Sequence, residues 1–140
     1  MLDTQLKSLL INALDEAFKA LNAASPIVAS QYKNMYLCFK TKGTIKEICN
    51  TIQALESTMH GAVTLVHANN IAKESSFDNT PIHFAKTLQT LEQALEVTYT
   101  ALHQNNESAA KLHLCNYNLA YESKNCATLC HTIYEFYNMQ

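Results

Sequence analysis

Apolar side chains recur every three or four residues along most of this 140-residue chain, which is the spacing of one face of an α-helix. Five such rows, separated by polar or proline-containing breaks, predict five helices. We expect these helices at residues 3–22, 26–41, 44–73, 81–103 and 106–140. The row of the first helix consists of Leu6, Leu10, Leu14 or Ala13, Ala17 and Leu21.

Signals for helix ends lie between these rows. A serine or threonine followed by proline, typical of an N-cap and the first helical position, occurs at residues 25–26 and 80–81. Thr44 and Glu47 have the spacing of a capping box, in which each side chain accepts a hydrogen bond from the other residue's backbone N–H. Gly43 stands where the C-terminus of a helix favours a positive φ. These signals agree with the boundaries that the apolar rows predict.

The last expected helix is the longest, and Asn105 or Asn106 is its expected N-cap. Its apolar row has a single exception, Glu122. The row consists of Leu112, Cys115, Leu119, Glu122, Cys126, Leu129, Ile133 and Phe136. Because a free thiol packs as a small apolar group, we expect Cys115 and Cys126 to be buried, reduced and unliganded.

The composition supports a helical fold. The chain contains only two Gly and two Pro, residues that hairpins and tight loops require, so a β-rich fold is not expected. Hydrophobic residues make up 48%, and a chain of this length can bury a core without disulfides or metals. The prediction is an all-α fold: a single-domain antiparallel bundle of about five helices with a four-helix-bundle-like core, spanning residues 1–140.

The charge and the cysteine content of the chain limit which classes of partner and which cellular location are expected. The formal net charge is −2 and every basic residue is lysine, so the arginine that usually recognises phosphate is missing and nucleic acid is not expected as a partner. No run of about 18 apolar residues is present, so no membrane span is expected. The odd number of cysteines and the absence of a visible signal peptide favour a cytoplasmic location. Export of the protein by a route that needs no signal peptide is the alternative.

A run of ligand-capable side chains lies near the C-terminus. Glu122, Cys126 and Cys130 follow one another at four-residue intervals, so they share one face of the expected helix, and His131 comes next. Carboxylate, thiolate and imidazole groups all bind zinc and other transition metals. The run also resembles the c-type haem attachment site of the cytochrome c′ family, although three residues instead of two separate its cysteines. The competing interpretation is that the cysteines are ordinary packing residues.

A second candidate site is a surface. Leu114, Tyr117 and Tyr121 lie opposite the row that contains Leu112 and Leu119, so this half of the expected helix is apolar on both sides. Such a helix is either buried at the centre of the bundle or covered by a partner. Tyrosine is favoured at interfaces because its large ring has a polar tip. The three residues are therefore candidate partner-binding residues, with burial inside the bundle as the alternative.

No glycine-rich phosphate loop and no nucleophile motif is present in the sequence. We therefore expect a non-enzymatic helical bundle that acts through protein–protein interaction, as an adaptor, a small effector or a self-associating subunit of a homo-oligomer. The alternative function is a metal- or cofactor-binding bundle that holds a transition metal such as zinc with the C-terminal Glu/Cys/Cys/His run.

Overall fold

The computed structural model describes the backbone of residues 2–69 and 79–140 and the side chains of residues 2–59 and 85–140. Within these residues the chain is helical and contains no strand, so the predicted all-α class is confirmed. The helices are α1 (Leu2–Ala24), α2 (Pro26–Lys42), α3 (Ile45–Asn69), α4 (Asn79–Asn105), α5 (Glu107–Leu112), α6 (Leu114–Ser123) and α7 (Cys126–Asn138).

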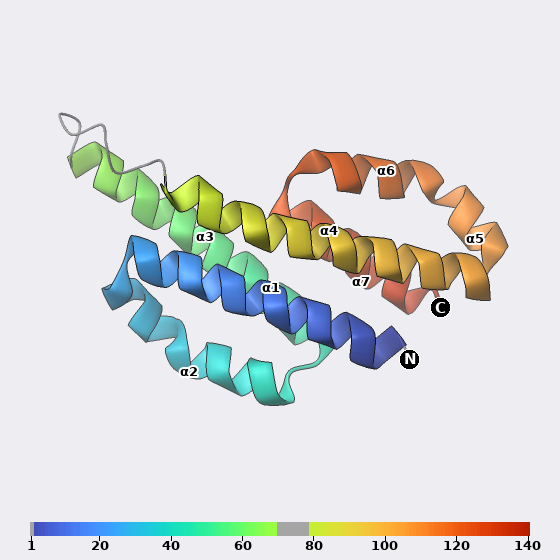
Figure 1. Ribbon diagram of the computed structural model, residues 1–140, viewed down its shortest axis with the longest axis horizontal. Coiled ribbons are helices and arrows are strands. Elements are labelled where there is room, and N and C mark those ends of the chain that lie inside the picture. The colour runs from blue at the N-terminus through green and yellow to red at the C-terminus, as the bar shows by residue number, and fades with distance from the viewer. Residues whose placement is uncertain (1, 70–78) are drawn as a thin grey trace.

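Four helices, α1, α3, α4 and α7, form the core of the bundle. α1 packs against α3 and α4, and α7 packs against the same two helices. The remaining helices cover opposite edges of this core: α2 lies along α1 and α3, whereas α5 and α6 lie along α4 and α7 (Figure 1). The protein is therefore a four-helix core with an additional helical layer on two sides.

Consecutive long helices run in opposite directions, as in the predicted antiparallel bundle (Figure 1). A consequence is that α1 and α3 run in the same direction, and so do α4 and α7. Two neighbouring helices with the same direction need a connection that returns the chain along the bundle. α2 returns the chain between α1 and α3, and α5 with α6 does the same between α4 and α7. The outer helices therefore cover the edges of the core and also connect the core helices that run in the same direction.

The interior of the bundle consists of large aliphatic side chains from all four core helices. The apolar row predicted on α1 is confirmed, because Leu6, Leu10, Leu14 and Leu21 are fully buried. The large side chains buried from α3, α4 and α7 include Ile48, Ile52, Leu55, Leu91, Leu95, Leu102, Leu129, Ile133 and Phe136. Burial of each such side chain contributes roughly 1.5–3 kcal/mol. Among the described residues, no helix is long and apolar enough to cross a membrane.

Side-chain caps define two of the predicted helix starts. The Thr44 N–H donates to Glu47 Oε1 (2.9 Å) and the Glu47 N–H donates to Thr44 Oγ1 (3.2 Å), which confirms the capping box. The Val28 N–H donates to the hydroxyl of Ser25 (3.4 Å), which confirms the N-cap of α2. α4 begins at Asn79, two residues before the start that the threonine–proline signal predicts.

Gly43 ends α2 for a different reason from the one predicted. Its φ is −70°, so the expected positive φ is wrong. The Gly43 N–H donates to the carbonyl of Phe39 (2.9 Å), and a Cβ atom added to Gly43 would lie only 2.5 Å from that carbonyl oxygen. The close approach of two backbone segments, and not a left-handed conformation, therefore requires glycine here.

The prediction of one continuous helix over residues 106–140 is wrong, because the chain forms α5, α6 and α7 there. α6 ends at Ser123, and its C-cap residue Lys124 has a φ of 52°, the only positive value of a non-glycine residue in the described part of the chain. Asn125 then caps α7, since its side chain accepts a hydrogen bond from the Thr128 N–H (3.0 Å). The break lets the chain turn back, so that α6 packs against α7.

The break at Lys124 also divides the apolar row predicted for this region. Its second half is buried and consists of Cys126, Leu129, Ile133 and Phe136. Its first half is exposed and consists of Leu112, Cys115, Leu119 and Glu122. The expected burial of Cys126 is confirmed and that of Cys115 is wrong. A left-handed residue interrupts the helical periodicity, so positions on either side of it no longer share a face.

We predict that Gly43→Ala destabilises the protein by about 1–3 kcal/mol, because the new methyl group has no room beside the Phe39 carbonyl. Urea unfolding followed by circular dichroism measures this change. Lys42→Ala, at the exposed neighbouring position, is the control and should shift the midpoint little. An unchanged midpoint for Gly43→Ala would show that the backbone relaxes freely at this turn.

Candidate partner-binding surface

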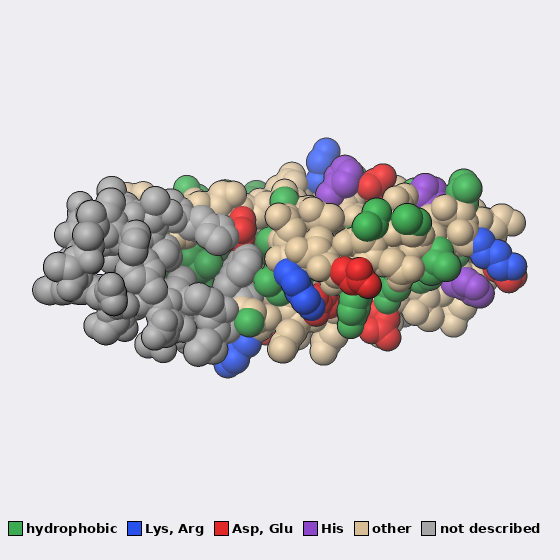
Figure 2. Space-filling model, turned by 90° about the horizontal axis from the view of Figure 1, so that it is seen from above, with side chains coloured by type: hydrophobic (Ala, Val, Ile, Leu, Met, Phe, Trp, Pro, Cys, Tyr) green, Lys and Arg blue, Asp and Glu red, His purple; other side chains and the backbone are tan. Residues whose placement is uncertain are grey.

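Exposed apolar side chains are concentrated on the outer layer formed by α5 and α6. Among the described residues, six large hydrophobic side chains are exposed, and four of them lie within ten consecutive positions. These four define what we call the α6 face: Leu112 (79% exposed), Leu114 (48%), Leu119 (63%) and Tyr121 (37%). Figure 2, which views the molecule from the α6 side, shows hydrophobic side chains over this layer with charged side chains between them.

The α6 face is held in place by contacts on the opposite side of the same helix. Tyr117 is half-buried and stacks on Tyr99 of α4, with ring centroids 4.5 Å apart. The Tyr99 hydroxyl also donates a hydrogen bond to the carbonyl of Ala110 in α5 (2.6 Å). Ala110 and Ala120 are buried, which lets α5 and α6 approach the core closely. The exposed apolar residues therefore belong to two helices, α5 and α6, that are both attached to the bundle.

An ion pair anchors the end of α6. Lys124 Nζ lies 2.6 Å from Glu92 Oε2 of α4, and the Glu92 side chain is only 11% exposed. The hydrogen bond to Glu92 raises the pKa of Lys124 above its ordinary value. The same ammonium group lies 5.9 Å from the ring centroid of Tyr121, which places this ring beside the anchor. The contact explains why a lysine occupies the left-handed position that ends the helix.

The three residues that sequence analysis singled out for partner binding have different environments. Leu114 and Tyr121 are exposed, but Tyr117 points toward α4 and is half-buried. Sequence analysis missed Leu112 and Leu119, which it assigned to a buried row. The polar run Ser-Lys-Asn at residues 123–125 was the signal that could have placed a helix end before α7.

The geometry does not bring the four candidate metal ligands together. Cys126 and Cys130 are buried in the core, whereas Glu122 is exposed on α6, on the other side of the break. His131 is also exposed, and its Nε2 lies 3.0 Å from Glu135 Oε1 one turn further along α7. Among the described residues, no group of three histidine, cysteine or acidic side chains is arranged to hold a metal ion.

Two of these cysteines instead belong to a buried thiol cluster with Cys49 of α3, which sequence analysis did not connect to them. The exposed fractions of Cys49, Cys126 and Cys130 are 2%, 1% and 0%. Hydrogen bonding to Cys126 and Cys49, together with burial, raises the pKa of Cys130 well above its ordinary value of 9.0. A thiol with a raised pKa is a poor nucleophile and a poor metal ligand. The cluster therefore acts as packing between α3 and α7.

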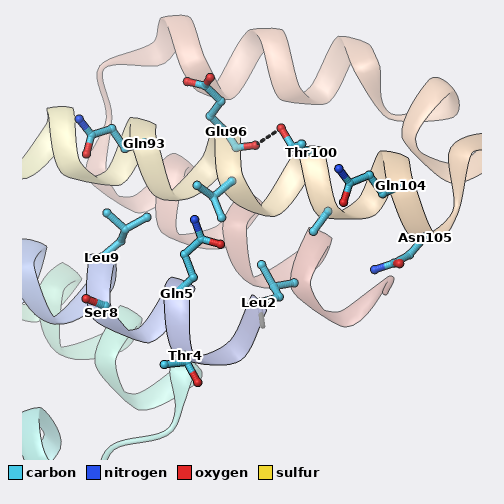
Figure 3. A pocket seen from close by; sticks show the side chains of 12 residues that line it. Leu2, Thr4, Gln5, Ser8, Leu9, Gln93, Glu96, Thr100, Gln104 and Asn105 are labelled. Atoms are coloured by element: carbon cyan, nitrogen blue, oxygen red, sulfur yellow. Dashed lines mark hydrogen bonds between the residues drawn. The ribbon is translucent and has the colours of Figure 1, made fainter.

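An open groove of about 910 Å³ lies between α1 and α4 (Figure 3). Nearly all the side chains that line this groove are uncharged. The lining residues are, from α1, Leu2, Thr4, Gln5, Ser8 and Leu9 and, from α4, Gln93, Glu96, Val97, Thr100, Ala101, Gln104 and Asn105. Glu96 is the single ionisable side chain among these lining residues. General acid–base catalysis commonly needs a second titratable group at the same place. We assign no chemistry to this groove.

Comparison with protein-family models, curated proteins and solved structures finds no match to this chain. Function is therefore inferred from the geometry of the described residues.

We predict that the native protein has two fast-reacting and three slow-reacting thiols. Cys38 and Cys115 are exposed, whereas Cys49, Cys126 and Cys130 are buried, and buried thiols react only when the protein opens. Titration with a chromogenic disulfide reagent counts both classes, and unfolding in urea should merge them. A fast count above two would contradict the burial of the thiol cluster.

We also predict that substitutions on the two sides of α6 have different effects on stability. Tyr117→Ala removes the stack on Tyr99 and should destabilise the protein by about 1–3 kcal/mol. Leu119→Ala, on the exposed side, should change stability by less than about 0.5 kcal/mol. Thermal unfolding of both variants provides the measurement. Equal losses of stability would mean that Leu119 is also packed in the protein's interior.

Proposed function

We propose that this chain is a non-enzymatic helical bundle that acts by binding a protein through the α6 face. The observation that carries the proposal is the grouping of exposed Leu112 at the end of α5 with exposed Leu114, Leu119 and Tyr121 of α6. Large apolar side chains scattered singly over a surface need no explanation, but a group of them commonly marks an interaction site.

The composition of the α6 face supports a protein partner over a charged ligand. Residues 112–121 contain no Lys, Arg, Asp or Glu. Depletion of charged residues together with a tyrosine is typical of the central part of protein–protein interfaces. A nucleic acid or another polyanion would instead need several basic side chains on the same surface.

The way in which α6 is attached supports the proposal as well. Tyr117, Lys124 and the buried Ala120 all contact the core from the inner side of the helix, which leaves the outer side unobstructed. A helix that is ordered before binding loses less conformational entropy in the complex. The α6 face therefore has the properties of a preorganised docking helix.

Site-specific photo-crosslinking tests this proposal. With a photoreactive amino acid at position 119, the protein should form one discrete adduct in its native cell, because this position lies in the proposed contact. The same amino acid at position 33, an exposed site on α2 at the other edge of the bundle, is the matched control. Mass spectrometry identifies the adduct. No adduct at position 119, or equal adducts at both positions, would contradict the proposed function.

A further inference from the structure

We infer that Cys49 of α3 and Cys130 of α7 form an oxidation site, a pair of buried thiols that hydrogen peroxide converts into a disulfide across the bundle. The exposed fractions of the two side chains are 2% and 0%. They belong to two different core helices, so the bond joins segments that are far apart in the chain. This inference concerns the thiol cluster and is independent of the function proposed for the α6 face.

The packing of α3 against α7 places Cys49 opposite Cys130. The two helices are in contact and run in opposite directions (Figure 1). Lys46 Nζ lies 5.9 Å from the ring centroid of Tyr134, and this contact fixes one point of their register. Cys49 follows Lys46 by three positions on α3, and Cys130 precedes Tyr134 by four positions on α7. Because three or four residues make about one helical turn, the two thiols meet one turn further along the interface.

The contacts between the thiols agree with this register. Cys130 is hydrogen-bonded to both Cys126 and Cys49, so it is the middle member of the cluster. Cys126 lies one turn from Cys130 on the same helix. Side chains with that spacing have Cβ atoms about 5–6 Å apart, whereas a disulfide needs about 3.5–4.5 Å. A bridge within the intact α7 is therefore excluded, and Cys49 is the partner that the geometry leaves for Cys130.

The reaction is a two-electron oxidation of the pair by hydrogen peroxide. The sulfur of one cysteine attacks a peroxide oxygen and breaks the O–O bond, which gives a sulfenic acid, and the thiol proton leaves with the released hydroxide as water. The sulfur of the other cysteine then attacks the sulfenic sulfur, the S–O bond breaks and a second water leaves. Two thiols and one peroxide thus give one disulfide and two waters.

The surroundings of the pair determine when this reaction occurs. Adjacent positions on both helices, such as Ile52 and Leu129, are fully buried aliphatic side chains. Hydrogen bonding to Cys126 and Cys49, together with burial, raises the pKa of Cys130, so little of the reactive thiolate is present in the closed bundle. Peroxide reaches the pair when α7 opens locally. The thiols therefore pack the core in the reduced protein, and their slow oxidation ties α3 to α7.

Peptide mapping of the oxidised protein tests the inference. The variant Cys38→Ser, Cys115→Ser removes the two exposed thiols, which would otherwise join separate molecules, and keeps the buried cluster. After hours in excess hydrogen peroxide, the folded variant should retain one thiol that can be alkylated in denaturant. Mass spectrometry without reduction should show the peptides of Cys49 and Cys130 linked, with Cys126 alkylated.

Substitutions within the cluster are the matched controls. In the same background, Cys126→Ala should retain the disulfide, whereas Cys49→Ala and Cys130→Ala should each abolish it. Circular dichroism verifies the fold of each variant, and mapping of the unsubstituted cluster does not depend on these variants. Three free thiols after oxidation overturn the inference. A bridge to Cys126, a sulfinic acid without a bridge, or a bridge that forms only in urea does so as well.

Thermal unfolding supplies a second measurement. A disulfide between distant segments restricts the unfolded chain, so the oxidised protein should melt about 5–15 °C above its reduced form. A thiol reductant should return the melting temperature to the reduced value. Peroxide treatment of the Cys49→Ala variant should leave its melting temperature unchanged, which separates the bridge from other oxidation. A bridge that lowers the melting temperature would show that the core distorts to form it, and this result also overturns the inference.

Discussion

The bundle depends on the burial of one leucine row of α1 between α3 and α4. Leu6, Leu10, Leu14 and Leu21 have no solvent exposure, and α1 contacts α2, α3 and α4. Loss of one such side chain typically costs roughly 2–5 kcal/mol, a large fraction of the roughly 5–15 kcal/mol that stabilises an average domain. The positions of α3 and α4, and through them of α7, therefore follow from this row.

The outer helix α2 is attached to the core by different chemistry. The Tyr36 hydroxyl donates to Asp15 Oδ1 of α1 (2.5 Å), and its ring stacks on Phe18 at a centroid distance of 4.3 Å. Burial and the neighbouring Asp15 raise the pKa of Tyr36 above its ordinary value. Lys40 Nζ lies 3.1 Å from the same carboxylate. These contacts use few buried aliphatic groups and leave most of α2 exposed.

α6 repeats this pattern on the opposite edge of the core. A tyrosine stack, Tyr117 on Tyr99, and a lysine–carboxylate contact, Lys124 with Glu92, again join an outer helix to a core helix. Because the attachment needs only the inner side of α6, the residues of its outer side are not required for folding. Those residues are free to serve binding, and their apolar character is what links the architecture to the proposed function.

The sequence by itself determined the features that depend on neighbouring residues: the all-α class, the leucine row of α1 and the capping box of Thr44 and Glu47. Periodicity and capping depend only on residues that are close in the chain, so both can be recognised from the sequence alone. Only the tertiary structure decided that the chain turns at Lys124, because that turn is supported by α4. The turn exposes Leu119, which local periodicity had assigned to the core. The contact of Cys49 with the α7 cysteines likewise depends on helix packing between distant segments, and the physical reason is that periodicity defines a helix face but not what covers it.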